Sequence, residues 1–354
     1  MMGAMMSYSV ALNFEDGVSR FIQCNPGETV LDAAYRQQVN LPMDCADGVC
    51  GSCKCHCERG DYQLGDDYLE DALSAEEAGQ RQVLTCQMVP HSDCVIDVPM
   101  ASALCKTGCE TFSASVVSAA ALSDSALELT LQLDDVHSSI AFLPGQYVNI
   151  EVPGSDARRA YSFSSPPNAR RLSFLLRNVP GGAMSSYLSG QARPGDKMRL
   201  HGPQGSFYLR NVTRPLLFLA GGTGLAPFLS MLEQLAQDGV QRPVRLLYGV
   251  THDCDLVKLD QLDDYRSRLG DFSYLTCVAS DASQAARKGY VTQHLDDALL
   301  HDGDVDVYLC GPPPMVEAVL HDFRRRAFTP ASFHYEKFAP SQTAQGVADA
   351  TATF

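Results

Sequence analysis

The chain has 354 residues, of which 45% are hydrophobic and 19% are charged, a composition typical of globular domains and not of disordered or fibrous chains. Its 42 acidic and 27 basic residues give a net charge of −15, which argues against nucleic acid as a partner. No apolar run approaches the roughly 20 residues that span a bilayer, so no membrane segment is expected.

The length predicts two or three domains, because single hydrophobic cores stop growing at about 250–300 residues. The start, MMGAMMSYSV, lacks the basic segment and the long apolar core of a signal peptide, so a cytoplasmic protein is expected. A reducing cytosol disfavours disulfides, and the 13 cysteines are therefore expected to bind metal, to do redox chemistry or to pack.

The first segment, residues 1–105, has the pattern of a small β-rich unit with one main helix. Strand-like residues on both sides of Asp16 and Gly17 predict a hairpin over residues 8–24, and residues 28–39 have the apolar spacing of a helix. This segment holds 16 acidic and 5 basic residues, a balance of −11. An acidic surface suits a basic docking partner, although solubility explains the charge about as well.

One loop carries five cysteines within thirteen residues, and residues 45–57 read CADGVCGSCKCHC. Cys45, Cys50 and Cys53 have the spacing C-x4-C-x2-C, and Cys86 lies further along the chain. This is the plant-type ligand set, with three thiolates on one loop and a fourth from a distant strand. We therefore predict that these four cysteines bind a [2Fe–2S] cluster.

Cys55 and Cys57 close the same loop and are expected to pack in a core. They alternate with polar residues after Cys53, so a strand would place them on one buried face, where small thiols pack well.

A zinc site is the alternative to the cluster. It would be built from two cysteine pairs: Cys50 with Cys53, and Cys105 with Cys109. Zinc would leave Cys45 and Cys86 without a role and would cross a domain boundary. The cluster is therefore the favoured prediction.

The second segment, residues 106–209, consists of short strand-like runs separated by Gly and Pro turns, which predicts a small antiparallel β-barrel. One run contains Arg159, Tyr161, Ser162 and Phe163 immediately before a Pro-Pro turn. An Arg beside a Tyr and a Ser suits a flavin, whose phosphate, ring and N5 these side chains can bind. An ordinary exposed strand edge is the alternative for this motif alone.

A second flavin-binding element is expected at a short helix that begins near Gly182, Met184 and Ser185. The amide groups of a helix start have no intrahelical partners and can bind a pyrophosphate. Capping of the helix by Ser185 explains the same residues about as well.

The third segment, residues 210–338, alternates apolar strands with helices, one of them expected over residues 290–300, which predicts a parallel α/β sheet. Two loops of this segment each follow a strand and precede a helix, at the strand ends that face the ligand crevice in such sheets. The first contains Gly221, Gly222, Thr223, Gly224 and Pro227; the second contains Cys310, Gly311, Pro312 and Met315. We expect both loops to bind a dinucleotide, with Cys310 beside the nicotinamide unless it is simply a buried cysteine. Residues 339–354 are expected to be a disordered tail.

The coenzyme is predicted from the residues after the next strand. An acidic ribose ligand about 20 residues after the glycine-rich turn is missing, and Asp253 or Asp255 is expected to take the ribose hydroxyls instead. The stretch VTHDCDL (250–256) contains no Arg or Lys to hold a 2′-phosphate. NADH is therefore expected in preference to NADPH.

Together these motifs resemble the ferredoxin–NADP reductase superfamily, in the branch with a ferredoxin domain fused at the N-terminus. The motifs RAYS, PGQY, GGTGLAP and CGPPPM occur here in that family's order and approximate spacing. The resemblance covers nearly the whole chain. It implies a multidomain α+β and α/β protein: a β-grasp-like [2Fe–2S] ferredoxin domain (1–105), an FAD-binding antiparallel β-barrel (106–209) and an NADH-binding α/β domain (210–338). The stretches RQQVNLPMDCADGVCGSC and VYLCGPPPMVEAV resemble more specifically the reductase components of benzoate, toluate and anthranilate 1,2-dioxygenases.

The resemblance also implies roles for single residues. Arg159 would bind an FAD phosphate, Tyr161 would stack on the isoalloxazine, and the segment from Gly182 to Ser185 would hold the pyrophosphate. Phe338 would lie near the flavin.

Three residues would form the hydride-transfer site by this resemblance. Ser162 would approach the flavin N5, Cys310 would lie near the nicotinamide, and Glu336 would place a carboxylate near the hydride path.

The expected function is transfer of hydride from NADH to FAD, and of single electrons to the cluster and on to a Rieske-type aromatic-ring dioxygenase. The acidic first domain would dock that terminal oxygenase. A reductase of a di-iron phenol- or methane-type monooxygenase shares every motif and is the alternative within the same class. A flavin and iron–sulfur redox sensor without an oxygenase partner is the alternative from another class.

Overall fold

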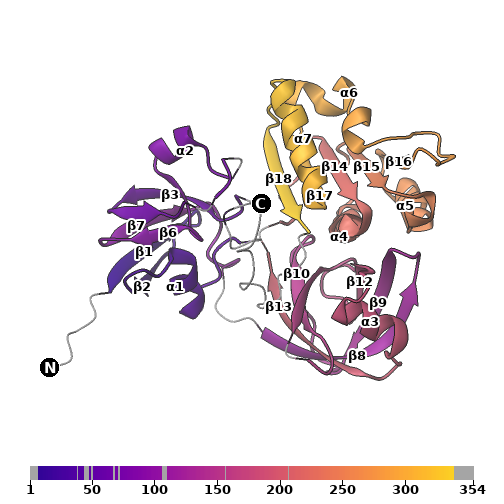
Figure 1. Cartoon of the computed structure of the whole chain (residues 1–354), viewed down its shortest axis with the longest axis horizontal. Helices are drawn as coiled ribbons and strands as arrows, with labels where there is room; N and C mark the ends of the chain where they lie inside the picture. Colours follow the sequence, from indigo (N-terminus) through magenta and orange to yellow (C-terminus); the bar gives the residue numbers. More distant parts are fainter. Residues whose placement is uncertain are drawn as a thin grey trace, which may run out of the picture.

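The structure is a computed structural model that describes residues 7–37, 39–43, 48, 51–66, 68–70, 72–105, 110–155, 157–205 and 207–338. These residues form three modules in chain order (Figure 1). No helix within these ranges is long and apolar enough to cross a bilayer. The predicted tail, residues 339–354, lies outside the described residues, and the predicted boundary near residue 105 adjoins residues that are not described. The domain limits therefore stay predictions.

The first module is a mixed sheet of five strands in the order β2-β1-β7-β3-β5. Its strands are β1 (Tyr8–Phe14), β2 (Ser19–Cys24), β3 (Lys54–Arg59), β5 (Gln82–Leu84) and β7 (Cys94–Val98), and β4 (Tyr62–Leu64) pairs separately with β6 (Met88–Pro90). Strand β1 runs parallel to β7 and antiparallel to β2, which confirms the predicted hairpin. The short helix α2 (Ala75–Gly79) follows the cysteine loop.

Helix α1 (Val30–Arg36) is shorter than the predicted range 28–39. Thr29 is its N-cap, and the Thr29 side chain accepts a hydrogen bond from the Asp32 amide at 3.1 Å. Glu28 therefore stands before the helix, where its carboxylate pairs with Arg36 at 2.7 Å. The apolar face of α1 packs on the sheet and helps to close the core that holds the cysteines.

The second module is the predicted antiparallel barrel. Its strands are β8 (Glu110–Ala121), β9 (Ala126–Leu133), β10 (Tyr147–Glu151), β11 (Arg158–Ser162), β12 (Arg171–Arg177) and β13 (Lys197–Gln204), in the order β11-β10-β13-β8-β9-β12. An antiparallel bridge between Phe163 and Phe174 joins the two outer strands and closes the ring. Helix α3 (Ala183–Gly190) packs against this barrel.

The third module is the predicted parallel sheet, with the order β16-β15-β14-β17-β18. The strands are β14 (Leu216–Gly221), β15 (Val244–Val250), β16 (Phe272–Val278), β17 (Asp306–Gly311) and β18 (Ser332–Lys337); the main helices are α4 (Ala226–Asp238), α5 (Leu259–Arg268) and α7 (Pro313–Arg325). Alternate apolar residues of β14 enter two cores, one on each face of the sheet. The chain order reverses between β14 and β17, which creates the crevice where ligands of such sheets bind.

One predicted helix of the third module, over residues 290–300, is wrong as a single element. The segment forms a 3₁₀ turn, η3 (Val291–His294), and then a single helical turn, α6 (Asp297–Leu300). Asp296 interrupts the helix because its side chain accepts the Leu299 amide at 3.0 Å and starts a new helix.

Candidate functional site

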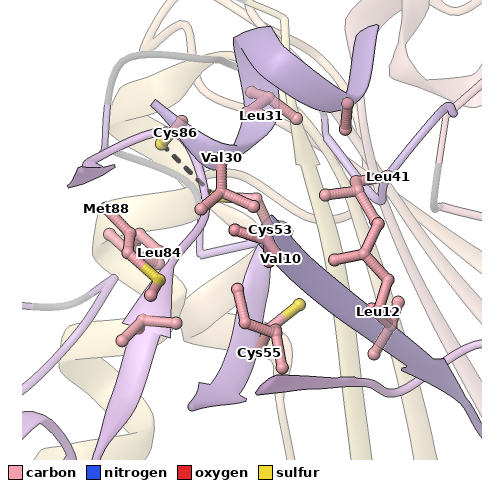
Figure 2. Close-up of a cluster of buried hydrophobic side chains, with 14 of the residues drawn as sticks. Val10, Leu12, Val30, Leu31, Leu41, Cys53, Cys55, Leu84, Cys86 and Met88 are labelled. Carbon is pink, nitrogen blue, oxygen red and sulfur yellow. Dashed lines mark hydrogen bonds between the residues drawn. The ribbon is translucent and has the colours of Figure 1, made fainter. Parts of the chain in front are cut away.

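Two of the four predicted cluster ligands lie in the described part of the chain, and they face each other. Pairing of β3 with β5 brings Cys53, just before β3, next to Cys86, just after β5. Their Sγ atoms are 3.3 Å apart without a disulfide, and both side chains are buried (Figure 2). Two buried, reduced thiols at this separation fit a shared metal centre. Cys45 and Cys50 lie outside the described residues, so the full ligand set stays a prediction.

The backbone of the cysteine loop requires glycine beside these ligands. Gly48 and Gly51 have φ angles of +80° and +73°, a region that other residues rarely adopt. A Cβ at Gly51 would lie 3.2 Å from the carbonyl oxygen of Ala72 and 3.4 Å from the hydroxyl of Tyr335. The loop is thus held closely by neighbouring backbone, as the tight wrapping of a cluster requires.

Cys55 and Cys57 are buried in the core of the first module, which agrees with the predicted packing role. Cys57 also has a polar environment that the alternation did not predict. Hydrogen bonds from the Cys94 thiol and from the Arg81 guanidinium, whose Nη2 lies 3.3 Å from Sγ, lower the pKa of Cys57 to about 6. The pKa of Cys57 is thus lowered by its polar partners, whereas burial raises the pKa of Cys55 above the usual range of a thiol.

The zinc alternative finds no support at Cys105. This residue is fully buried in the same hydrophobic core, and its thiol contacts Met100 Sδ at 3.6 Å. Burial raises the pKa of the Cys105 thiol to about 12, as expected for a cysteine packed in an apolar core. Cys109 lies outside the described residues.

The predicted flavin motif lies on β11, at the end of the barrel next to the third module. Arg159 and Tyr161 alternate with Ala160 and are half-buried, while Ser162 is buried at the end of the strand. Burial raises the pKa of the Tyr161 hydroxyl, so this side chain presents a neutral ring. A cation, an aromatic ring and a hydroxyl on one short strand fit a phosphorylated, planar flavin.

Two residues predicted to contact the flavin have their side chains inside the barrel core instead. The ring of Phe163 is fully buried and stacks on Phe142, with ring centroids 3.8 Å apart and planes 9° from parallel. Met184 is buried among the same core residues. Because these side chains fill the barrel core, the prediction that Phe163 and Met184 bind the flavin now rests on their backbone groups.

The start of helix α3 keeps its predicted place but uses Ser185 differently. Gly182 is the N-cap, so the first amides of the helix have no intrahelical partners and suit an anion. The Ser185 hydroxyl accepts the amide of Val179 at 2.9 Å and also approaches the carbonyl of Arg177. It therefore shapes the loop before the helix and does not cap the helix.

The two predicted dinucleotide loops lie against each other at the carboxyl ends of β14 and β17. A Cβ at Gly221 would meet Met315 Sδ at 2.3 Å, and a Cβ at Gly224 would meet the carbonyl oxygen of Cys310 at the same distance. A Cβ at Gly311 would lie 2.9 Å from Met315 Sδ and 3.3 Å from the Cα of Gly221. Glycine is needed here because the backbones of the two loops are in contact at the carboxyl ends of β14 and β17.

The other residues of the first loop divide between the crevice and the core. Gly222 and Thr223 are half-exposed in the turn η1 (Gly222–Leu225), and Gly222 has a φ of +55°. Pro227 is buried in the first turn of α4, where a missing N–H costs nothing. Pro312 is the N-cap of α7 in the second loop.

Three residues that are far apart in sequence meet where the barrel adjoins the parallel sheet. The Ser162 hydroxyl lies 3.4 Å and the Cys310 Sγ 3.7 Å from the same oxygen, Oε2 of Glu336. Parallel pairing of β17 with β18 sets Cys310 opposite Glu336, and all three side chains are buried. The site thus has a carboxylate, a hydroxyl and a thiol at one point, between the flavin strand and the coenzyme crevice.

Phe338 follows β18 and continues its pairing, since the Phe338 amide donates to the carbonyl of Gly311 at 3.0 Å. Its side chain is half-buried against the core of the third module. The residue therefore lies beside the second coenzyme loop, in a position compatible with the predicted contact.

The two candidate ribose ligands have different partners. Asp253 is exposed after β15 and accepts a hydrogen bond from the Ser283 hydroxyl at 2.7 Å. Asp255 instead accepts hydrogen bonds from the hydroxyls of Ser123 and Ser125 in the barrel. Asp255 therefore joins two modules, and Asp253 remains the candidate that faces the open end of the sheet.

Sequence reasoning missed two further features at this edge. Arg287 and Lys288 return to the end of β16 through backbone pairing with Val278, so basic residues do lie beside the coenzyme end of the sheet. Lys258 also pairs with Glu128 of the barrel. Neither follows from local patterns, because the partners are distant in sequence.

Family models match all three modules. The model described as "2Fe-2S iron-sulfur cluster binding domain" matches residues 13–91, "Oxidoreductase FAD-binding domain" matches 113–208, and "Oxidoreductase NAD-binding domain" matches 218–321. The toluate 1,2-dioxygenase electron transfer component of Pseudomonas putida is 56% identical over 336 residues, 95% of this chain and 100% of that protein. The chain belongs to the family of dioxygenase electron transfer components. This reductase is thus an oxidoreductase with domains for a [2Fe–2S] cluster, FAD and NAD.

The other similar proteins include components of a further dioxygenase, of a monooxygenase and of a cytochrome P450 system. The 2-halobenzoate 1,2-dioxygenase electron transfer component of Burkholderia cepacia is 48% identical and covers 95% of this chain and 99% of its own. The phenol 2-monooxygenase reductase component of Pseudomonas is 31% identical over 99% of both chains. Among solved structures, the Amycolatopsis cytochrome P450 reductase GcoB has a TM-score of 0.70 at 32% identity, over 94% of this chain and 99% of its own. The same three-module fold therefore occurs in reductases named for different oxygenases.

Proposed function

We propose that this reductase takes hydride from NADH and delivers single electrons to the Rieske-type oxygenase component of a benzoate-type aromatic-ring dioxygenase. The observation that carries the chemistry is the meeting of Ser162, Cys310 and Glu336 between the flavin strand and the coenzyme crevice. The dioxygenase partner is supported by the relatives, since the 56% and 48% identical proteins are both named for dioxygenases. All ten described cysteines are reduced thiols, which fits a reducing, cytoplasmic setting.

The site supports this chemistry through its placement of groups. Bound FAD would accept a hydride and release single electrons, which a [2Fe–2S] cluster can take only one at a time. Arg159 and Tyr161 would hold the flavin, and the glycine loops would hold the dinucleotide. Glu336 places a buried carboxyl group beside the crevice where positive charge would develop as NADH gives up its hydride.

Reconstitution tests the proposed function. The purified reductase is mixed with NADH and, separately, with a benzoate-type dioxygenase oxygenase and a phenol-type di-iron monooxygenase, and the hydroxylated product is measured per NADH consumed. The proposal expects tight coupling with the dioxygenase and weak coupling with the monooxygenase. Tighter coupling with the monooxygenase than with the dioxygenase would establish the monooxygenase alternative. That alternative is supported by the 31% identical reductase component of a phenol 2-monooxygenase. NADH oxidation that no oxygenase accelerates would favour a redox sensor.

The docking surface is proposed to be the acidic segment beside the cysteine loop. The Leu69 amide donates to the carbonyl of Gly48 at 3.1 Å, which ties this segment to the loop, and Asp66, Glu70 and Glu76 are exposed around it. Opposite charges on two partners accelerate their association and are screened by salt.

Reversing charge on this surface should slow docking without affecting NADH oxidation. The double variant Asp66→Lys/Glu70→Lys is expected to lower kcat/KM for the oxygenase about tenfold at low ionic strength. Raising the salt concentration should reduce the difference in kcat/KM for the oxygenase between this variant and the unsubstituted reductase. The double variant Glu110→Lys/Asp135→Lys, at two exposed acids of the barrel, is the matched control because it changes the net charge by the same amount. An equal loss in that control would mean that overall charge matters and not this surface.

Asp253 is expected to select the coenzyme. Asp253→Asn should lower kcat/KM for NADH about tenfold, the scale of a lost hydrogen bond to a charged group, while NADPH improves relative to NADH. Arg287 and Lys288 at the same sheet edge favour this outcome, since either can meet a 2′-phosphate once the carboxylate is gone. Steady-state kinetics with both coenzymes measure the ratio. Asp260→Asn on α5 is the control, and a ratio that moves equally in both variants would remove Asp253 from the ribose site.

A further inference from the structure

Strand β18 connects the hydride site with the cluster loop. It is the edge strand of the third module and faces the first module (Figure 1). Glu336 points to the hydride site, where it meets Ser162 and Cys310. The preceding residue, Tyr335, points to the opposite side of the strand, because successive side chains of a strand alternate.

The side chain of Tyr335 crosses to the first module. Its ring lies against Phe333, with ring centroids 5.4 Å apart, and both pack on the core beneath α7. Its hydroxyl reaches Gly51, where it would lie only 3.4 Å from a Cβ at that position. Gly51 stands between the predicted cluster ligands Cys50 and Cys53 in the sequence, so the tip of Tyr335 lies beside the backbone of the cluster loop.

The surroundings of this contact are open. A cavity of about 360 Å³ lies at the same junction and is lined by Gly51 and Ser52 from the first module, by Phe207 from the barrel, and by Leu320, His334 and Tyr335 from the third module. The first module also contacts the barrel through Tyr208, which packs into the first module's core. This cavity leaves part of the junction between the first and third modules unfilled. The approach of Tyr335 to Gly51 is therefore expected to contribute strongly to the position of the cluster loop.

We infer that Tyr335 is a positioning residue for electron transfer: its hydroxyl holds the cluster loop at a fixed place relative to the strand that carries Glu336. This inference rests on the proposed function, since it concerns the step from the flavin to the cluster. Reacting centres that are displaced by even about 1 Å can lose much of their rate, so a contact that fixes them contributes directly to the rate. Hydride transfer to the flavin does not depend on this contact.

The test separates the two steps in the full-length reductase loaded with FAD and cluster. Tyr335→Phe removes only the hydroxyl, and Tyr335→Ala removes the whole contact. Stopped-flow absorbance after mixing with NADH gives the rate of flavin reduction and the later rate of cluster reduction. Tyr35→Ala, an exposed tyrosine on α1 that is 59% accessible, is the matched control.

The inference expects unchanged flavin reduction in all variants and a cluster reduction that is about tenfold slower in Tyr335→Ala, with Tyr335→Phe in between. Amide hydrogen exchange of the oxidised protein without NADH supplies a second readout: peptides that include residues 51–54 should exchange faster in Tyr335→Ala, and barrel peptides should not change.

Three outcomes would overturn the inference. Equal cluster reduction in all variants would show that the contact has no effect on electron transfer. Equal slowing of both steps would show that Tyr335 only keeps β18 and Glu336 in place. Slowing of Tyr335→Ala without faster exchange near Gly51 would place its effect elsewhere. Failure of NADH to reduce the cluster in the unsubstituted protein would instead contradict the proposed function itself.

Discussion

Cys86→Ala should abolish the iron–sulfur cluster and leave the flavin chemistry intact. Cys86 is a buried thiol 3.3 Å from Cys53, and its removal takes away the one predicted ligand that comes from outside the loop. Iron content and the visible absorbance of the cluster should fall to background. Reduction of the oxygenase should fall to background as well, whereas NADH oxidation with ferricyanide, which the flavin can reduce directly, should stay near its original rate.

Cys55→Ala provides the matched control, because it removes another buried thiol from the same core. A cost of about 1–2 kcal/mol in stability is expected from the lost packing of a small side chain, with the cluster retained. If Cys86→Ala kept its iron while Cys55→Ala lost it, the predicted ligand set would be wrong. Loss of iron from both variants would indicate that the core, and not the ligand, had failed.

Glu336→Gln should slow hydride transfer about 100-fold, within the range found for positioned charged and proton-handling groups. The amide keeps an acceptor for the Ser162 hydroxyl, so the substitution removes mainly the capacity of this buried group to carry a negative charge. Stopped-flow reduction of the flavin at saturating NADH measures this step. NADH affinity should change little, because the effect belongs to the charge that develops in the transition state.

Glu317→Gln is the control for this substitution, since Glu317 lies on α7 with a side chain that is 56% exposed. It should leave flavin reduction unchanged. A Glu336→Gln variant with normal flavin reduction would mean that the carboxylate serves only packing between the modules. In that case the meeting of Ser162, Cys310 and Glu336 would be structural, and the hydride site would need other residues.

The sequence predicted the three modules because each has a strong local signal. Short strands between Gly and Pro turns predict a barrel, and the alternation of apolar strands and helices after residue 210 predicts a parallel sheet. The glycine loops were predictable because only glycine allows the backbones that follow β14 and β17 to lie in contact. A Cβ at Gly221 or Gly224 would clash with the facing loop. Helix ends were less predictable: Thr29 and Asp296 cap helices that the apolar spacing alone would have extended.

What the sequence could not predict are contacts between modules. Asp255 seemed as good a ribose ligand as Asp253 until the structure brought it to Ser125, 130 residues away. Phe163 belongs to the flavin motif by position, yet its ring is needed to fill the barrel. The contact of Tyr335 with the cluster loop has no local signal, since it depends on how β18 meets another module.

Anaerobic titration with NADH, followed by visible spectroscopy and low-temperature EPR, tests whether electrons pass from NADH through the flavin to the cluster. We predict that NADH bleaches both flavin and cluster absorbance and produces a rhombic signal of a reduced [2Fe–2S] centre, which is absent from Cys86→Ala. Bleaching of the flavin alone, with no iron signal in the unsubstituted protein, would contradict this prediction. The loop at residues 45–57 would then bind no functional cluster, and the path from NADH to an oxygenase would end at the flavin.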